Sequence, residues 1–381
     1  MEISKDNVLL LNLLRLQSAF GAGSSRVVRI YEILENADFL SKPIDKSLYS
    51  LIDKKYADKI LDVDADILYG IIDDCLKNDI EIITISDEQY PDRLRSLNDS
   101  PIVLFIKGMF PDIDNEPIIS IVGPRRISNF GRKAAYSLSK RLAKSGIIIA
   151  SGGALGADTE AHKGALACNK VTIAVLGCGI CCDYLPENRA MREQISKNGC
   201  LISEYPPYTK GSKYSFPIRN RIISGISLGT VVVEAGVKSG ALITARHANE
   251  QGRDVFVIPG NPTFPQYKGS NALLRDGALP LLDASDVFNQ YISQYFDKID
   301  LEKAFADDIK NESFEKTEKK LHLGLSKEAE IVYNNLNKQK FTADDLLCMG
   351  IDNNVLISAL TELEVEQLIR AMPGGNYEII N

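Results

Sequence analysis

Two glycine-rich segments carry residue types and spacings that can hold phosphate groups. One runs from Gly123 through Arg125 to Ser128, and the other contains Gly152 and Gly153; each follows a short apolar run and precedes a helical pattern. A glycine turn between a strand and a helix directs backbone N–H groups and the positive end of the helix dipole toward an anion, which an arginine can clamp. Both segments therefore predict phosphate contacts, with the alternative that the glycines only turn tight corners.

Neither segment matches the patterns of the common nucleotide cofactors. The dinucleotide fingerprint Gly-x-Gly-x-x-Gly is absent from both, and neither is followed by the Lys-Ser/Thr pair of a P-loop. NAD and ATP are accordingly disfavoured, and we expect no cofactor.

A third segment, 210–221, holds four cationic and two aromatic side chains within twelve residues. Cations bind phosphates, and an aromatic face can stack under a base, so this composition indicates contact with single-stranded nucleic acid. The alternative is a solvated basic loop in which Phe216 is buried.

A fourth segment begins at Glu234, where an apolar run ends, and continues through Ser239 and Gly240 to Thr244 in a helical pattern. Ser239, Gly240 and Thr244 can donate hydrogen bonds to a phosphate or a sugar. Glu234 can be a general base, a ribose acceptor or a buried structural carboxylate, and the sequence leaves these alternatives open.

The elements that position these segments form an alternating series. Short apolar, mostly β-branched runs alternate with stretches of helical spacing such as 132–144, where Ala135, Leu138 and Leu142 share one face. This alternation predicts a doubly wound parallel sheet of the Rossmann-like α/β class, with its ligand beyond the carboxyl ends of the strands. The expected strands are 118–122, 147–150, 171–176, 200–204, 230–233, 255–258 and 279–282.

Different patterns flank this central domain, which we place at 81–285. Residues 1–80 contain short helical patterns separated by Gly21-Ala22-Gly23, and they predict a small helical domain; a helix–turn–helix that docks a duplex backbone is the alternative. Residues 286–325 are charged and predict a linker. Residues 326–381 combine three helical patterns with a hairpin, which predicts a winged helix.

The charge is distributed unevenly along the chain. Residues 117–285 carry 21 basic and 11 acidic side chains, a net of +10, whereas residues 1–116 have a net charge of -9 and residues 286–381 a net charge of -8. A basic centre between acidic ends indicates a polyanion-binding surface in the central domain. A winged-helix regulator that reads duplex DNA is disfavoured, because the C-terminal segment is acidic.

Other features of the sequence bear on the cellular compartment and on metal binding. No apolar run is long enough to span a membrane, and the N-terminus lacks the order of a signal peptide, so we expect a cytoplasmic protein. Seven cysteines, an odd number, fit reduced thiols. Cys178, Cys181 and Cys182 lack a fourth zinc ligand at a standard spacing, and we expect no metal and no catalytic set of residues.

Six motifs that occur in order resemble the DprA (Smf) family of DNA-processing proteins. They are Gly-x-Arg-x-x-Ser-x-x-Gly at 123–131, Ser-Gly-x-Ala-x-Gly-x-Asp-x-x-Ala-His at 151–162, Phe-Pro-x-Arg-Asn-Arg at 216–221, Glu-Ala-x-x-x-Ser-Gly-x-Leu-Ile-Thr-Ala at 234–245, Gly-Arg-x-Val-x-x-x-Pro-Gly at 252–260 and Gly-x-Asn-x-Leu at 269–273. The resemblance covers residues 81 to about 285, and residues 1–80 are similar to that family's sterile-alpha-motif-like domain.

The resemblance implies a protein that is not an enzyme. It implies that the protein binds and protects single-stranded DNA, forms a homodimer through the Rossmann-like domain and loads the RecA recombinase during natural transformation. An amphipathic stretch at 272–282 is the expected dimer contact. The family's DNA contacts carry over to Arg125, Lys213, Phe216, Arg219, Asn220 and Arg221.

Three positions depart from the family's pattern. Gly153 stands where a leucine is common, Pro124 follows the first glycine, and Leu185 is inserted into an Asp-Tyr-Pro sequence. A related enzyme family, the nucleoside-monophosphate phosphoribohydrolases, is the alternative, and it uses Pro-Gly-Gly-x-Gly-Thr-x-x-Glu. Here Gly229 and Thr230 are present, but three residues rather than two separate Thr230 from Glu234, and no Pro-Gly-Gly precedes Gly229.

Overall fold

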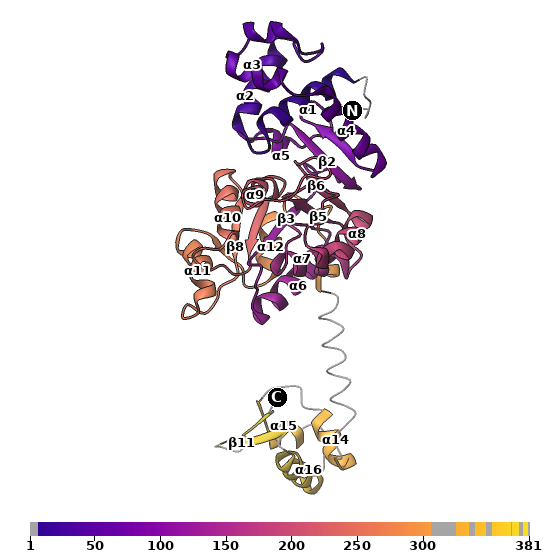
Figure 1. The fold of residues 1–381 in the computed structure, drawn as a ribbon. Helices are drawn as coiled ribbons and strands as arrows, with labels where there is room; N and C mark the ends of the chain where they lie inside the picture. Colours follow the sequence, from indigo (N-terminus) through magenta and orange to yellow (C-terminus); the bar gives the residue numbers. More distant parts are fainter. Residues whose placement is uncertain are drawn as a thin grey trace. The chain divides into compact units, whose positions relative to one another are not determined.

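The computed structural model describes residues 7–305, 325–334, 340–347, 353–366, 368–372 and 376–379. The chain divides into two units, Met1–Phe305 and Ala306–Asn381, and each is treated by itself (Figure 1). We call them the larger unit and the smaller unit.

The larger unit begins with short helices, as the sequence predicts. Asn7 caps the first helix by accepting a hydrogen bond from the Leu10 amide, and Gly21, with φ of 75°, ends it. Leu13, Leu34 and Ile60 are fully buried and join the helices into one core. The elements are α1 (Val8–Phe20), α2 (Ser25–Asn36), η1 (Lys46–Ser50), α3 (Lys54–Leu61) and α4 (Ala65–Lys77).

A nine-stranded sheet follows, in the order β1-β2-β6-β5-β4-β3-β7-β8-β9. The seven strands from β6 to β9 in this order run parallel, and all seven predicted strands are confirmed with small shifts of their ends. These strands are β3 (Ile118–Val122), β4 (Ile148–Ser151), β5 (Thr172–Leu176), β6 (Cys200–Ser203), β7 (Gly229–Val232), β8 (Asp254–Val257) and β9 (Leu279–Pro280).

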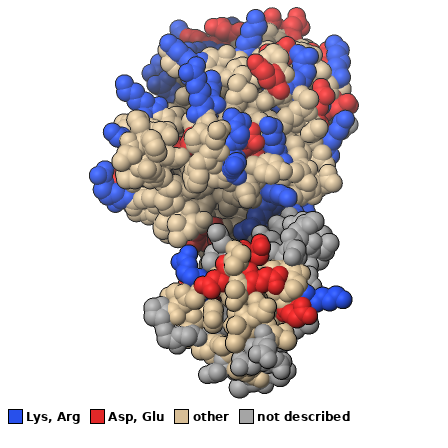
Figure 2. All heavy atoms as spheres, turned by 90° about the horizontal axis from the view of Figure 1, so that it is seen from below, with Lys and Arg blue, Asp and Glu red and all other residues tan. Residues whose placement is uncertain are grey.

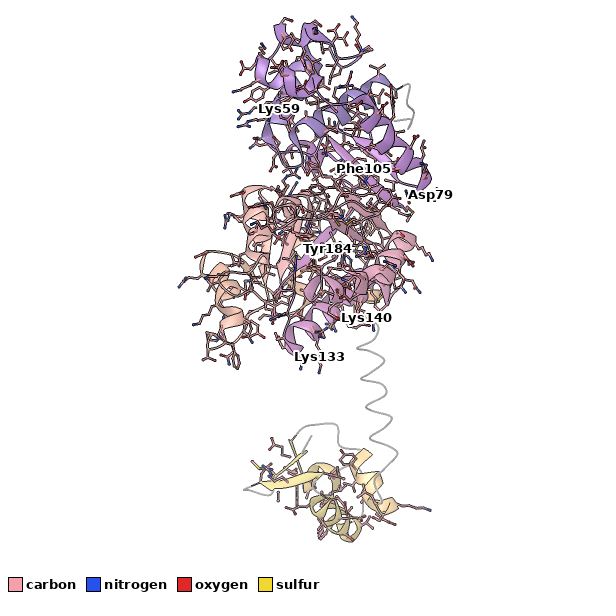
Figure 3. The ribbon with its side chains drawn as sticks, viewed as in Figure 1. Lys59, Asp79, Phe105, Lys133, Lys140 and Tyr184 are labelled. Atoms are coloured by element: carbon pink, nitrogen blue, oxygen red, sulfur yellow. The ribbon has the colours of Figure 1, made fainter. Side chains whose placement is uncertain are left out.

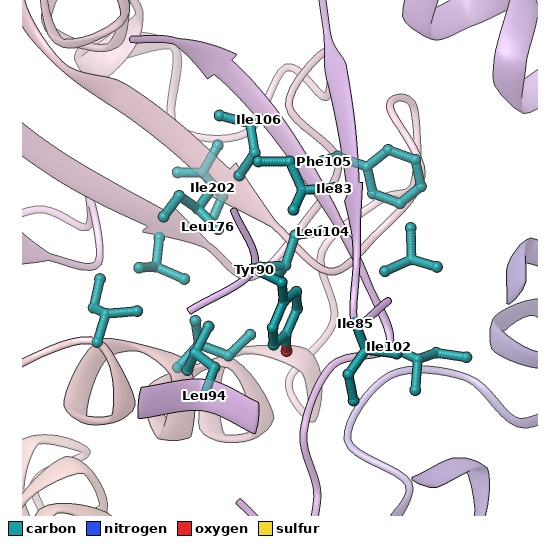
Figure 4. Close-up of a cluster of buried hydrophobic side chains, with 14 of the residues drawn as sticks. Ile83, Ile85, Tyr90, Leu94, Ile102, Leu104, Phe105, Ile106, Leu176 and Ile202 are labelled. Atoms are coloured by element: carbon teal, nitrogen blue, oxygen red, sulfur yellow. The ribbon is translucent and has the colours of Figure 1, made fainter. Parts of the chain in front are cut away.

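Two further strands, which we did not predict, extend one edge of the sheet. β1 (Glu81–Thr84) pairs antiparallel with β2 (Val103–Gly108), and β2 pairs antiparallel with β6. Apolar side chains of these strands meet Leu176 and Ile202 in the core beside α5 (Asp92–Arg95) (Figure 4). The Tyr90 hydroxyl donates to the Pro101 carbonyl at 2.6 Å, which satisfies its polar group inside this core.

Helices cover both faces of the sheet, which makes it doubly wound. Alternate residues of β3 point to opposite faces: Ile119 packs with Leu138 of α6, whereas Ile118 belongs to the core that contains Ile222 of α9. The helices are α6 (Asn129–Lys144), α7 (Ala157–Leu166), α8 (Arg189–Asn198), α9 (Ser215–Gly225), α10 (Ala241–Glu250), α11 (Lys268–Arg275) and α12 (Ala284–Tyr291). The Rossmann-like α/β class predicted from the sequence is confirmed.

The segment after the last strand packs against the sheet. Phe288, Tyr291 and Tyr295 are buried in the same core as α6, and the Tyr291 hydroxyl donates to Asp254 at 2.7 Å. The predicted linker, 286–325, therefore starts within a folded segment, because apolar residues spaced along α12 and after it cover the sheet. Residues 306–324 of that linker lie outside the described residues, and the other domain boundaries stay predictions.

The smaller unit has the elements of a winged helix. A three-stranded sheet in the order β10-β12-β11 accompanies three helices, and Leu356, Leu360 and Leu363 are buried in their core. The predicted turn at 373–375 lies outside the described residues. The elements are α14 (Lys327–Asn334), β10 (Lys340–Thr342), α15 (Ala343–Leu347), α16 (Asn353–Val365), β11 (Ile369–Met372) and β12 (Asn376–Ile379). In the described part of the chain, no helix is long and apolar enough to cross a membrane.

Candidate nucleic-acid interface

A hollow of about 520 Å³ lies beyond the carboxyl ends of β3 and β7. The chain runs from β3 outward to β6 on one side and then returns to β7 on the other side, so the order of the strands reverses here. Loops diverge at such a switch point and leave room for a ligand. Nine of the predicted site residues line this hollow, which we call the carboxyl-edge pocket: Gly123, Arg125, Lys213, Phe216, Arg219, Asn220, Ser239, Gly240 and Thr244.

Exposed cations form the rim of the carboxyl-edge pocket. Arg125 follows β3 and Lys213 precedes α9, and both side chains are exposed. The Arg125 guanidinium carbon lies 5.3 Å from the centre of the Phe216 ring, and the Lys213 ammonium lies 4.9 Å from the centre of the exposed Tyr214 ring. A basic group beside an aromatic ring suits a phosphate and a base that arrive together.

Phe216 lies half-buried between the rim and the interior. Its ring centre is 4.8 Å from that of Tyr184, with 33° between the ring planes. Its edge also lies close to Gly177, where a Cβ atom would meet the phenyl carbon Cδ1 at 2.6 Å. The ring is therefore held in place by its neighbours while part of it stays at the pocket, which combines features of both alternatives that the sequence left open.

Arg219 forms part of the floor of the pocket and is 5% exposed. Its guanidinium donates to the carbonyl of Gly152 at 2.7 Å and to that of Val175. Burial lowers the pKa of Arg219, and the neighbouring carboxylate of Asp158 opposes this shift. The side chain joins the loop after β4 to the end of β5, so its first role in this structure is to hold the floor together.

Gly152 and Gly153 of the second glycine segment do not line the carboxyl-edge pocket, although Ala154 beside them does. A Cβ atom at Gly152 would lie 2.7 Å from an Arg219 nitrogen and from an Asp158 oxygen, so the glycine is needed for their close approach. Gly153 has φ of +66°, a conformation that glycine adopts without strain. Both glycines shape the floor beside the pocket.

Arg221 lies outside the pocket and is 2% exposed. One terminal nitrogen of Arg221 donates to both carboxylate oxygens of Glu204 at 2.8 Å. A carboxylate oxygen of Asp99 lies 3.3 Å from the Nε atom of Arg221. The implied DNA contact at Arg221 therefore has no support in this geometry, because a buried, paired guanidinium is not presented to a strand at the surface.

The first glycine segment differs from the expected phosphate loop. The carboxylate of Glu234 is fully buried at the N-terminus of α6 and accepts hydrogen bonds from the Ser128 amide and hydroxyl at 2.7 and 2.6 Å. An internal carboxylate thus occupies the place where the helix dipole would attract a ligand's phosphate. Of the alternatives for Glu234, the structural carboxylate is the one that this geometry fits, and Ser128 is its partner.

The fourth segment presents the N-terminus of α10 to the pocket. Gly240 stands at the helix N-cap with nothing within 4 Å of an added Cβ atom, and the Ser239 hydroxyl accepts a hydrogen bond from the Ala241 amide at 3.3 Å. Ser239 and Thr244 line the pocket beside it. The positive end of the α10 dipole therefore faces the pocket, whereas the Glu234 carboxylate already occupies the N-terminus of α6.

Asp158 is a pocket residue that we did not predict as part of the site. It lies on the floor, 8% exposed, and accepts a hydrogen bond from the Ala154 amide at 3.2 Å. Burial raises the pKa of this carboxyl, and Arg219 opposes the shift. Its place in the motif at 151–162 was the only signal in the sequence, and a carboxylate beside a phosphate site is not what charge alone predicts.

Lys and Arg side chains spread over the face of the larger unit that Figure 2 shows, with Asp and Glu side chains among them. Lys133 and Lys140 lie on α6 (Figure 3). Among the described residues, no three His, Cys, Asp or Glu side chains gather in a way that could hold a metal ion.

Comparison with known proteins then defines the family. The model of the DNA recombination-mediator protein A family matches residues 81–292. The chain belongs to this family. The DNA processing protein DprA of Bacillus subtilis is 40% identical over 211 residues, which is 55% of this chain and 71% of that protein.

Two solved structures of the family resemble this one. The X-ray structure of DprA from Streptococcus pneumoniae has 29% sequence identity and a TM-score of 0.63, and the match covers 76% of this chain and 98% of that one. A structure of DNA processing protein A from Helicobacter pylori describes the single-stranded DNA binding mode of that protein. It has 29% sequence identity and a TM-score of 0.52, and the match covers 57% of this chain and 97% of that one. The resemblance inferred from the six motifs is confirmed.

Proposed function

We propose that this chain binds single-stranded DNA in the carboxyl-edge pocket. The observation that carries the proposal is the meeting of Arg125, Lys213 and the half-buried Phe216 around one hollow, beside the N-terminus of α10. Cations and helix N–H groups bind phosphates without reading sequence, and an aromatic ring stacks on any base. The Helicobacter pylori relative, which binds single-stranded DNA, supports the same ligand here.

We also propose that the DNA-bound protein is a homodimer that loads the RecA recombinase in natural transformation. A hollow of about 630 Å³ beside the edge of the sheet supports the dimer; Leu242, Leu273 and Leu279 line part of it, and charged and polar side chains line the rest. β9 has only two residues, and Pro280 lacks an N–H group, so side-chain packing rather than strand pairing would join the subunits. Light scattering that gives a monomer at micromolar concentration would count against this part.

The role of the protein in this proposal is not catalytic. A phosphoribohydrolase needs a carboxylate that faces its nucleotide, whereas both oxygens of Glu234 are engaged by Ser128. Release of free base from nucleoside monophosphates by the purified chain would favour the enzyme instead.

Fluorescence anisotropy with the full chain tests the central proposal. A labelled thymidine oligonucleotide and a duplex of equal length are titrated at two salt concentrations. Tighter binding of the single strand, weakened in the double variant Arg125→Ala/Lys213→Ala, is the expected result. Equal affinity for the duplex, or an unaffected double variant, would contradict the proposal. Faster RecA assembly on single-stranded DNA in the presence of the chain is expected if loading is correct.

A further inference from the structure

We infer that the N-terminal helical domain positions the carboxyl-edge pocket through α9, and that Gly23 and Glu204 are the residues that transmit this. The inference rests on the proposed function, because the affected property is affinity for single-stranded DNA. It concerns residues that lie outside the carboxyl-edge pocket.

The turn between α1 and α2 contacts helix α9 of the sheet domain. Gly23 has φ of +70°, and a Cβ atom at this position would overlap the Cγ2 atom of Ile218. Ile218 lies on α9 between Phe216 and Arg219. The turn thus touches the helix turn that carries the aromatic side chain and the floor arginine.

Glu204 binds the same turn through hydrogen bonds. Its Oε1 accepts a hydrogen bond from the Gly23 amide at 3.0 Å, and its carbonyl accepts one from the side-chain amide of Gln17 at 2.6 Å. Glu204 follows β6 directly, so a strand end of the sheet and the N-terminal domain share one buried carboxylate.

The other side of Glu204 holds α9. Arg221 donates to both of its carboxylate oxygens, and the Arg221 carbonyl accepts a hydrogen bond from Gln251 after α10 at 3.0 Å. Glu204 and Arg221 are 3% and 2% exposed, so the pair has little room to rearrange. A chain of contacts therefore runs from α1 and α2 through Glu204 to α9.

The consequence concerns the orientation of α9. The half of this helix next to the contact carries Phe216, Arg219 and Asn220, all of which line the pocket. A displacement at Ile218 would rotate or shift these side chains relative to Arg125, which stands on a different loop. Gly23 and Glu204 are positioning residues in this scheme, since neither lines the pocket.

Two glycines in one turn provide a matched test. Gly21 has φ of +75° and nothing within 4 Å of an added Cβ atom, whereas Gly23 has nearly the same φ and meets Ile218. Gly21→Ala and Gly23→Ala each place a side chain on a residue of positive φ, so both should lower the melting temperature. Only Gly23→Ala is expected to weaken binding of a thymidine oligonucleotide, by about fivefold or more, as a partly lost stacking contact would.

Rescue separates positioning from general damage. Ile218→Ala leaves only a Cβ atom near the new methyl group, at a distance of ordinary contact. The double variant Gly23→Ala/Ile218→Ala should regain most of the lost affinity, measured on the full chain well below its melting temperature. Equal affinity of Gly21→Ala and Gly23→Ala, or a double variant as weak as Gly23→Ala, would overturn the inference.

Glu204→Gln provides a second route if Gly23→Ala does not fold. It keeps the size of the side chain and removes the charge that pairs with Arg221, and the same loss of affinity per folded molecule is expected. Unchanged affinity would overturn the inference. If the wild-type chain and Gly21→Ala both fail to bind single-stranded DNA, the proposed function itself fails, whereas binding by both with no effect of Gly23→Ala leaves that function standing.

Discussion

The rim and the floor of the carboxyl-edge pocket contain the same kinds of residue in opposite environments. Arg125 and Lys213 on the rim are exposed, whereas Arg219 on the floor and Arg221 behind it are 5% and 2% exposed and are engaged by carbonyl and carboxylate oxygens. An exposed cation can exchange water and counterions for a DNA phosphate, while a buried one contributes to the fold. A basic residue in a motif therefore does not identify a DNA contact until its burial is known.

The largest expected effect is on the free energy of unfolding and comes from Arg221, which is buried outside the pocket. Arg221→Ala leaves the Glu204 carboxylate buried without its partner, which should lower the free energy of unfolding by about 3 to 5 kcal/mol. Chemical denaturation measures this change. Arg126→Ala, at an exposed position in the first loop, is the control and should change stability by less than about 0.5 kcal/mol. Equal effects of the two changes would remove the distinction between rim and floor.

The next largest effect is a pH dependence of the free energy of unfolding, which comes from the buried side chain of His162. His162 is fully buried with its Nδ1 2.8 Å from the Thr172 hydroxyl, and burial lowers its pKa to about 3. Since the unfolded chain takes up this proton near pH 6.5, stability is present above that pH and is lost as the pH falls toward 3, by about 1.4 kcal/mol per pH unit from this group.

Denaturation curves between pH 7 and pH 4 measure the dependence, with His162→Asn as the comparison because carboxyl groups also titrate in this range. The variant should lose less stability on acidification than the wild type. Parallel pH dependences would mean that His162 takes up its proton in the folded state as readily as in the unfolded one.

Phe216→Ala distinguishes a stacking role of the ring in DNA binding from a packing role in the core. As a stacking platform the ring should contribute about 1 to 3 kcal/mol to DNA affinity, with little change in the salt dependence because it has no charge. A core role would instead appear as about 3 to 5 kcal/mol of lost stability. Affinity at several salt concentrations and thermal stability are measured on the same variant, with Phe130→Ala, 54% exposed on α6, as the control. Lost stability with unchanged affinity of the folded protein would exclude stacking.

The smallest effects belong to the single rim cations. Arg125→Ala and Lys213→Ala should each flatten the dependence of log affinity on log salt by roughly 0.7 and leave stability unchanged. Lys59→Ala, on an exposed face of α3, is the control (Figure 3). The same measurement on Arg219→Ala is decisive for the comparison: lower stability with an unchanged slope is expected, and a flattened slope at full stability would place Arg219 with the rim.

The fold could be read from the sequence because its signals are local. Short β-branched runs alternate with helical spacing, and glycines stand where strands end, so the parallel sheet and the pocket edge followed. β1 and β2 were missed because they pair antiparallel outside this alternation. The segment after 285 was assigned to a linker because its charged residues hide the spacing of Phe288 and Tyr291.

By itself the sequence determined the family, the doubly wound sheet and the segments that meet at its carboxyl edge. Only the tertiary structure decided which charges face solvent. Glu234 lies 106 residues from Ser128 and fills the α6 N-terminus, and Glu204 lies 181 residues from Gly23 yet joins it to Arg221. No local pattern encodes such pairs, because the energy of a charge depends on burial and on partners that distant parts of the chain supply.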